Sequence, residues 1–203
     1  MVFINRGLSS LESELKGIDE NTLRDFTDAW SVQRQLKRGE WLSPLHTADS
    51  NIYWINEGAV KICCLADDKE IIVEFGYNGQ CVFDLPAYFS EKPSNFYIEA
   101  FRNTEMIGIA KSDFVKFVNE NQAIANFWMR NIEKILLNFV DREVDLLSNA
   151  SAIRLERLLQ RKPDLFQHIP LKYIAAHLRM TPETLSRMRK KLTYIKDSAL
   201  SAQ

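Results

Sequence analysis

The stretch that decides the fold runs from residue 170 to residue 192 and reads PLKYIAAHLRMTPETLSRMRKKL. Its apolar residues recur at helical spacing in two short runs, which predicts a pair of amphipathic helices. The second helix is predicted to begin at Pro182, because the Thr181 hydroxyl can cap a backbone N–H and proline needs no N–H partner there. The predicted core that the two helices share consists of Ile174, Ala175, Leu178, Met180, Leu185, Met188 and Leu192.

This pattern is typical of a helix-turn-helix, whose second helix enters the major groove of DNA. Arg187 can pair with guanine O6 and N7, Glu183 can accept from cytosine N4, and Ser186 is a permissive partner. The predicted DNA-binding residues are Thr181, Glu183, Thr184, Ser186, Arg187, Lys190 and Lys191. Further cations, which predict phosphate contacts in a chain of formal net charge −1, are Lys172, Arg179, Arg189 and Lys196.

The region before this pair has a different pattern. Between residues 30 and 109, short aromatic and β-branched runs alternate with turn residues, as at residues 52–55 and 71–75. Such a pattern predicts a β-barrel or jelly roll. The glycines of the predicted turns, which take positive φ at little cost, are Gly39, Gly58, Gly76 and Gly79. Residues 9–26 are predicted to form short amphipathic helices.

A long helix is predicted between the barrel and the helix pair, because the helical period continues from Asp113 to about Leu147 without Gly or Pro. Apolar residues spaced by three and four along it suit a coiled-coil-like contact with a second copy. Packing on the barrel is the alternative, and a stripe widened by Leu136, Leu137 and Val140 allows both. The predicted dimer interface consists of Trp128, Ile132, Ile135 and Phe139.

The predicted fold class is therefore α+β, with three parts. A sensor barrel with N-terminal helices occupies residues 1–118, a dimerisation helix residues 119–148, and a helix-turn-helix domain residues 149–203. The small polar residues 148–151 are the predicted hinge. A chain of 203 residues, 46% of them hydrophobic, can bury one large core and a smaller one.

Composition excludes several classes of protein. No signal peptide and no run of 18 apolar residues is visible, so a cytoplasmic protein without a membrane partner is predicted. Cys63, Cys64 and Cys81 lie in apolar strand-like runs and are predicted to be buried thiols. Of three histidines, His168 and His177 lie in the C-terminal part, so the barrel lacks the two histidines of an oxygenase iron site. A protein without enzymatic activity is predicted.

The chain resembles the CRP/FNR family of bacterial transcription regulators over nearly its full length. The resemblance lies in the basic-Gly-Glu turn at residues 37–42, the aromatic strand at 52–60, the glycine turn at 75–79, and the set of Glu183, Ser186 and Arg187. It implies a barrel of cyclic-nucleotide-binding type and a homodimer on double-stranded DNA. A palindromic operator with TGA-type half-sites follows from it, and RNA polymerase is a candidate partner.

Departures from the family bear on the ligand. Phe83-Asp84 and Ser94-Asn95 stand where cyclic-AMP-binding members place a Gly-Glu and an Arg-Ser pair. Without that arginine a buried cyclic phosphate lacks its cation, so cyclic AMP is not the expected effector. The predicted effector pocket, for a ligand that the sequence does not name, consists of Phe83, Asp84, Leu85, Tyr88, Ser94 and Asn95.

No cofactor is predicted. Residues 1–30 contain no cysteine, whereas the iron–sulfur members of the family carry a cysteine cluster there. His46 or Cys63 could ligate a haem, but a lone barrel histidine is more often an ordinary turn residue.

Two departures concern the helix-turn-helix. Arg179 replaces the usual turn glycine, which costs on the order of 1 kcal/mol at positive φ. The sequence also ends soon after Leu192, where relatives continue into a β-hairpin wing, so a domain lacking a full wing and of modest DNA affinity is expected. The alternative function is an interaction or sensor protein that has lost DNA binding. The polar set of Glu183, Ser186 and Arg187 argues against it, because packing alone does not require these side chains.

Overall fold

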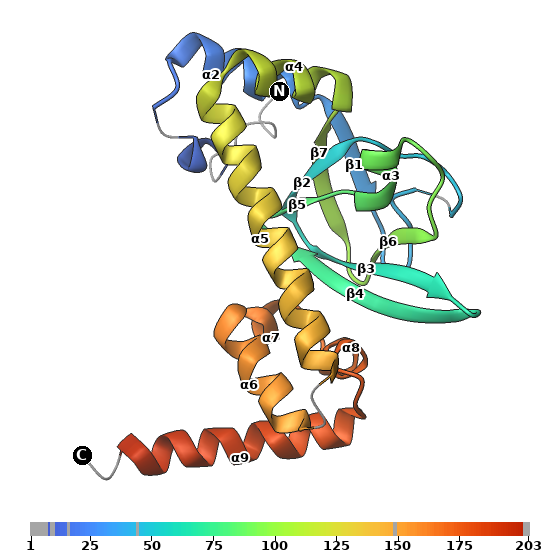
Figure 1. Cartoon of the computed structure of the whole chain (residues 1–203), viewed down its shortest axis with the longest axis vertical. Helices are drawn as coiled ribbons and strands as arrows, with labels where there is room; N and C mark the ends of the chain where they lie inside the picture. The colour runs from blue at the N-terminus through green and yellow to red at the C-terminus, as the bar shows by residue number, and fades with distance from the viewer. Residues whose placement is uncertain (1–7, 9–10, 16, 44, 148–149, 201–203) are drawn as a thin grey trace. The chain divides into compact units, whose positions relative to one another are not determined.

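The computed structural model describes residue 8 and residues 11–15, 17–43, 45–147 and 150–200, with side chains up to residue 191 (Figure 1). The chain forms two compact units, residues 1–136 and residues 137–203. Helix α5, Gln122–Leu147, contributes residues to both. Among the described helices, none has the length and apolar character needed to cross a membrane.

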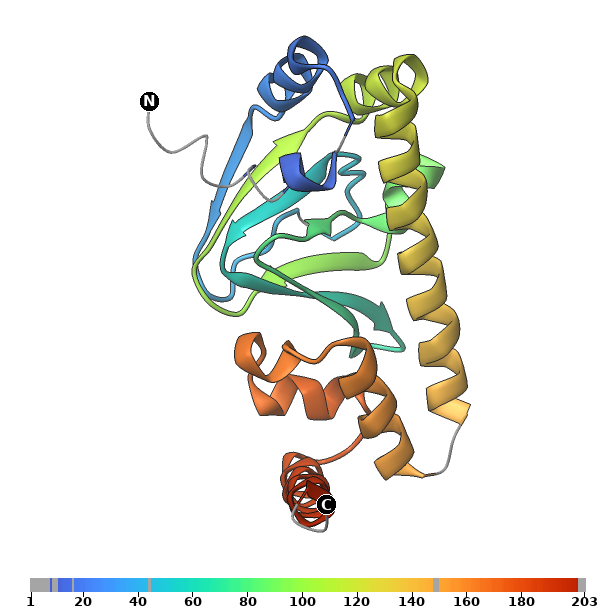
Figure 2. The same ribbon diagram turned by 90° about the vertical axis from the view of Figure 1, so that its left-hand side faces the viewer.

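The first unit contains two antiparallel sheets that curve into an open roll (Figure 2). The four-stranded sheet has the order β1 (Val32–Leu36), β7 (Thr104–Ile109), β2 (Ile52–Glu57) and β5 (Cys81–Val82). The three-stranded sheet has the order β4 (Lys69–Tyr77), β3 (Ala59–Ala66) and β6 (Phe96–Ala100). The predicted α+β class and N-terminal β roll are confirmed.

Strand β2 shows why the roll has two cores. Successive side chains of a strand point to opposite faces. Tyr53 and Ile55 lie in a cluster of barrel residues that includes Val60 and Ile98. Trp54 faces the other way, into a cluster that also takes apolar residues from the helices. The sheet is therefore covered on both faces.

Four described helices accompany the roll: α2 (Glu20–Ala29), α3 (Leu85–Ser90), α4 (Lys111–Glu120) and the first part of α5. The helices predicted in residues 9–26 appear as a helical stretch at 11–14 and as α2, which Asp19 caps by accepting from the Thr22 N–H at 3.0 Å. Residues 9, 10 and 16 of that prediction lie outside the described residues.

The prediction of one uninterrupted helix from Asp113 to about Leu147 was wrong. α4 ends at Glu120, and Asn121 adopts extended dihedral angles of φ −133° and ψ 116°. Its side-chain oxygen accepts from the backbone N–H of Ala123 at 2.9 Å and of Ile124 at 3.2 Å. Asn121 thus caps a new helix, so the long helix begins at Gln122 rather than at residue 119.

The second unit is helical in all its described residues, apart from short connections. After the end of α5 it contains α6 (Ser151–Arg161), α7 (Leu165–His168), α8 (Leu171–His177) and α9 (Pro182–Leu200). Residues 148 and 149 of the predicted hinge lie outside the described residues. α9 continues to Leu200, so residues 182–200 contain no strand of a wing.

The cysteines are free thiols. Cys63 is buried, and Cys64 and Cys81 are partly buried. Burial raises the pKa of the Cys63 thiol, and likewise that of Cys81, to about 12. These two thiols therefore remain protonated at neutral pH, which makes them poor nucleophiles.

The predicted turn glycines differ in how much space a side chain would have at each position. Gly58 has a φ of 110°, and a Cβ there would lie 2.4 Å from Thr104 Oγ1 and 2.6 Å from the Asn103 carbonyl oxygen. Gly39 also has positive φ, at 87°, but its Cβ would meet nothing within 4 Å. Gly76 was predicted to lie in a turn, but it lies in β4, where a Cβ would be 2.3 Å from Val82.

We predict that Gly58→Ala destabilises the first unit more than Gly39→Ala does. Both changes place a side chain at positive φ, at a cost on the order of 1 kcal/mol. Gly58→Ala adds overpacking against Thr104, about 1 to 3 kcal/mol more. Urea unfolding of the two variants measures the difference, and equal losses of unfolding free energy would contradict the packing at Gly58.

Candidate nucleic-acid interface

Helices α8 and α9 contact each other over a small apolar core. Ile174, Ala175, Leu178 and Leu185 are buried, as the sequence predicted. Met180 and Met188 are partly buried, and the side chain of Leu192 lies outside the described ones. The small side chain of Ala175 suits a site where two helices approach closely.

The turn between the two helices is closed by two backbone hydrogen bonds. Met180 N–H donates to the Ala175 carbonyl at 2.9 Å, and Arg179 N–H donates to the Ala176 carbonyl at 3.1 Å. This pair of bonds is a Schellman motif, which places Arg179 in the left-handed region at φ 53°. The expected positive φ of Arg179 is confirmed.

The start of α9 is capped by Thr181. Its hydroxyl oxygen accepts from the Thr184 N–H at 3.2 Å, and its hydroxyl lies 3.2 Å from Thr184 Oγ1. Pro182 occupies the first position of the helix, where no N–H is needed. The predicted start of the helix is confirmed, and the Thr184 side chain lies at the cap.

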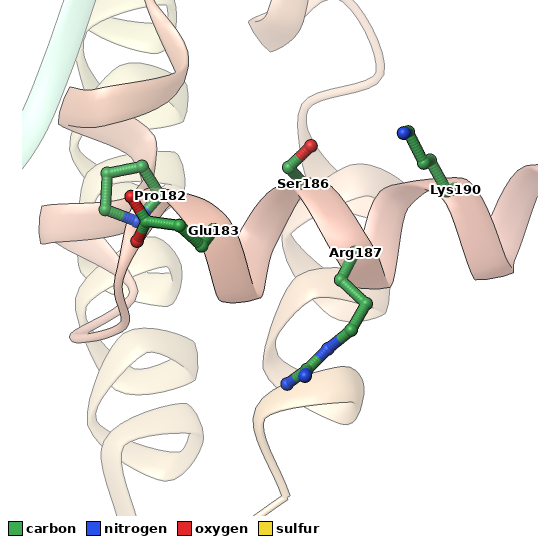
Figure 3. A pocket seen from close by; sticks show the side chains of 5 residues that line it. All are labelled: Pro182, Glu183, Ser186, Arg187 and Lys190. Carbon is green, nitrogen blue, oxygen red and sulfur yellow. The ribbon is translucent and has the colours of Figure 1, made fainter.

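The exposed side of α9 carries an open hollow of about 570 Å³, and the residues that line it are Pro182, Glu183, Ser186, Arg187 and Lys190. In Figure 3, Ser186 and Lys190 project to one side of the helix and Arg187 to the other. Four of the seven predicted DNA-binding residues nevertheless line the same hollow. Thr181, Thr184 and Lys191 do not line the hollow.

The hollow combines one anion with two cations. Hydrogen bonds from the Glu183 backbone and the Thr181 side chain lower the pKa of the Glu183 carboxyl. Glu183 is therefore an acceptor at neutral pH, and Arg187 and Lys190 are donors. A surface with both kinds of group can match the donors and acceptors of base edges as well as phosphate oxygens.

Two of the other predicted cations lie against aromatic rings. Lys172 stands over the Tyr173 ring at 4.6 Å, and the Arg189 guanidinium lies over the Phe166 ring at 4.9 Å. Lys191 is exposed, and the side chain of Lys196 lies outside the described ones. Arg189 thus packs toward α7 rather than toward the hollow.

The residues predicted to form an effector pocket lie at the junction of β5, α3 and β6. Asp84 and Ser94 are buried, and the Ser94 hydroxyl donates to Asp84 Oδ2. Phe83 and Tyr88 are buried in the core that the barrel shares with the helices, and Leu85 packs against that core. Asn95 is exposed. The structure brings Asp84 and Ser94 into direct contact. No sequence pattern predicts this contact, because ten residues separate the two side chains.

Three of the four residues predicted for a dimer interface contact the chain's own first unit. Trp128, Ile132 and Ile135 are partly buried and pack against the core that includes Phe83 and Phe114. Phe139 is partly buried. A neighbouring stripe of α5 is exposed instead, and the sequence analysis did not select it as the interface. The α5 stripe consists of Met129, Leu136, Leu137, Val140, Val144 and Leu147.

Residues 33–121 match the family model of the cyclic nucleotide-binding domain. No curated protein sequence matches the chain. Similar solved structures include the c-di-GMP responsive global regulator CLP of Xanthomonas campestris, which is 17% identical, with a TM-score of 0.64 over 88% of this chain and 93% of that one.

FixK2 from Bradyrhizobium japonicum is 18% identical, with a TM-score of 0.64 over 82% of this chain and 86% of that one. The catabolite activator protein of Thermus thermophilus is 19% identical, with a TM-score of 0.54 over 90% and 87% of the two chains. At these identities the likeness shows a shared fold. Residues 33–121 are therefore similar to the cyclic nucleotide-binding domain, and most of the chain has the fold of these three proteins.

Proposed function

We propose that the chain is a dimeric, sequence-specific DNA-binding transcription regulator of the CRP/FNR type that its sequence resembles. The observation that carries the proposal is the hollow at the start of α9, the second of two helices joined by a tight turn. It is lined by Glu183, Ser186, Arg187 and Lys190. The functional parts we propose are a barrel at residues 1–118, a DNA-binding domain at residues 149–203 and, between them, the dimerisation helix α5, Gln122–Leu147.

Each side chain of the hollow has a distinct task in this proposal. Arg187 pairs bidentately with guanine, and the ionised Glu183 accepts from cytosine N4. Ser186 contacts an adjacent base, and Lys190 binds phosphate. The half-site is of TGA type, as the resemblance to the family implies. It is repeated as an inverted palindrome, because a two-fold dimer presents two α9 helices about one helical turn apart. RNA polymerase is a further partner in the proposal.

The α5 stripe is the surface that we propose for a second copy of the chain. Its six side chains follow one another at spacings of mostly three, four and seven, and Leu136 is 61% and Val140 52% exposed. An exposed apolar row of this kind marks an interaction site, and a heptad-like spacing suits the same row of an identical helix. The opposite side of α5 then packs against the barrel core through Trp128, Ile132 and Ile135.

Selection of bound sequences from a random DNA pool with the purified full-length protein tests the proposed function. Enrichment of a palindrome with half-sites about one helical turn apart supports a dimeric sequence reader. Absence of enrichment, with and without cell extract, would favour the interaction protein that has lost DNA binding.

We predict different losses for two substitutions on the selected operator. Arg187→Ala costs about 1 to 3 kcal/mol of binding free energy and relaxes specificity at one base pair, because it removes a bidentate base contact. Lys190→Ala weakens binding to all sequences alike, because it removes a phosphate contact. Fluorescence anisotropy on the operator and on single-base variants measures both, and equal sequence-blind losses would remove Arg187 from base reading.

We also predict that Leu136→Glu yields monomers in analytical ultracentrifugation, because it places an unpaired charge in the proposed dimer contact. Val115→Glu on α4 is the matched control, since Val115 is also an exposed apolar side chain but lies off α5. The control remains dimeric. If the Leu136→Glu protein is still a dimer, the dimer interface does not lie on the α5 stripe.

A further inference from the structure

We propose that the hydrogen bond between Ser94 and Asp84 takes the place of a cyclic nucleotide, so that the barrel holds α3 against α5 without a small ligand. We call this bond the clasp. Its effect on DNA binding rests on the proposed function, whereas its effect on α3 and α5 can be measured independently.

The clasp uses both oxygens of the Asp84 carboxylate. Oδ1 accepts from the Ala87 N–H at 3.0 Å, which caps α3, and Oδ2 accepts from the Ser94 hydroxyl. The Ser94 oxygen in turn accepts from the Phe96 N–H at 3.1 Å, at the first residue of β6. Asp84 is 5% and Ser94 8% exposed, so water competes little for these bonds. The clasp therefore ties the start of α3 to the start of β6.

The side chains at this place do not fit a cyclic nucleotide. A buried phosphate needs a cation or several N–H donors around it. By resemblance to the family, the ribose would lie at residues 83–84 and the phosphate at residues 94–95. No arginine stands at residues 94–95 to pair with the phosphate. Asp84, which could accept from a ribose hydroxyl, already accepts from the Ser94 hydroxyl. The Phe83 ring lies within 5.2 Å of the Tyr88 ring and 5.6 Å of the Trp128 ring, measured between centroids.

The other end of α3 is held by Lys111 of α4. Lys111 Nζ lies 2.6 Å from the Tyr88 carbonyl oxygen and 2.6 Å from Glu91 Oε1. With both ends fixed, the Tyr88 ring stays 5.6 Å from Trp128 of α5. The clasp, the two rings of Phe83 and Tyr88, and Trp128 thus form one continuous set of contacts from the β5–β6 segment to α5.

This arrangement has a consequence for regulation. A ligand shifts a protein between two states only as far as it binds them with different affinity. In this barrel the chain itself supplies the contacts that order α3. A cyclic nucleotide therefore has no difference in affinity between the two states. On this proposal, a cyclic nucleotide therefore leaves the affinity of the protein for its operator unchanged.

Hydrogen–deuterium exchange of the full-length protein tests the clasp through peptides 85–90 and 122–132. Ser94→Ala removes the donor of the clasp and accelerates exchange in both peptides, by about tenfold. Ser90→Ala is the matched control, because Ser90 is exposed on the same helix and donates to the Pro86 carbonyl at 2.7 Å. The control exchanges at the wild-type rate in peptide 122–132. A Ser94→Ala protein that exchanges as slowly as wild type overturns the proposal.

The wild-type protein provides a second test that does not depend on any variant folding. Cyclic AMP, cyclic GMP and cyclic di-GMP at millimolar concentration leave its Tm and its exchange unchanged. A Tm raised by several degrees with any of them overturns the proposal, because a ligand of the native state stabilises it.

Operator binding separates the clasp from the proposed function. Equal operator affinity with and without the three nucleotides supports the clasp, and an affinity raised about tenfold by one of them overturns it. A wild-type protein that binds no DNA under any condition defeats the proposed function alone. The exchange and Tm measurements then decide for or against the clasp.

Discussion

The packing of Trp128 among aromatic rings is the contact on which the first unit depends. Its ring lies 4.9 Å from Phe114 of α4, 5.6 Å from Tyr88 of α3 and 5.6 Å from Phe83, measured between centroids. Phe114 extends the cluster to Phe26 of α2, at 6.1 Å. Aromatic pairs of this geometry contribute about 0.5–1.5 kcal/mol each beyond their burial. One side chain of α5 therefore joins the long helix to the elements at both ends of the barrel sequence.

The second unit depends instead on a short backbone motif. The Schellman bonds from Met180 and Arg179 end α8, and the Thr181 cap begins α9 directly afterwards. Two helices joined by so short a turn must cross closely, and a close crossing needs a small side chain between them. The buried Ala175 provides that small side chain. The positive φ of Arg179 is accepted because the bonds on either side determine the turn.

The features that the sequence predicted are those that depend on local chemistry. The aromatic and β-branched run at residues 52–55 and the Thr-Pro start of α9 act over a few residues, and both predicted elements are found in the structure. The face of α5 that covers the barrel could not be chosen, because apolar residues occupy two adjacent stripes and the choice depends on Phe83 and Phe114 of other elements. The break at Asn121 lacks the glycine or proline that usually marks one. The Asp84–Ser94 bond depends on how the intervening helix and loop fold back, which no spacing encodes.

The end of α5 is joined to α6 by charged groups, and their burial affects how ionic strength acts on the protein. Asp145 is 3% exposed and lies 2.5 Å from Arg161 and 3.3 Å from Arg157. Only Asp145 of these groups is buried, and the Arg161 and Arg157 side chains are 21% and 44% exposed. Dissolved ions screen such partly buried pairs less than fully exposed ones. In the proposed complex with DNA, by contrast, the exposed cations of α9 would release counterions from the phosphates that they contact. If the chain binds DNA as proposed, the slope of the logarithm of affinity against the logarithm of salt concentration would therefore report the number of phosphates contacted. Weakening of the ion pairs between α5 and α6 would contribute little to that slope.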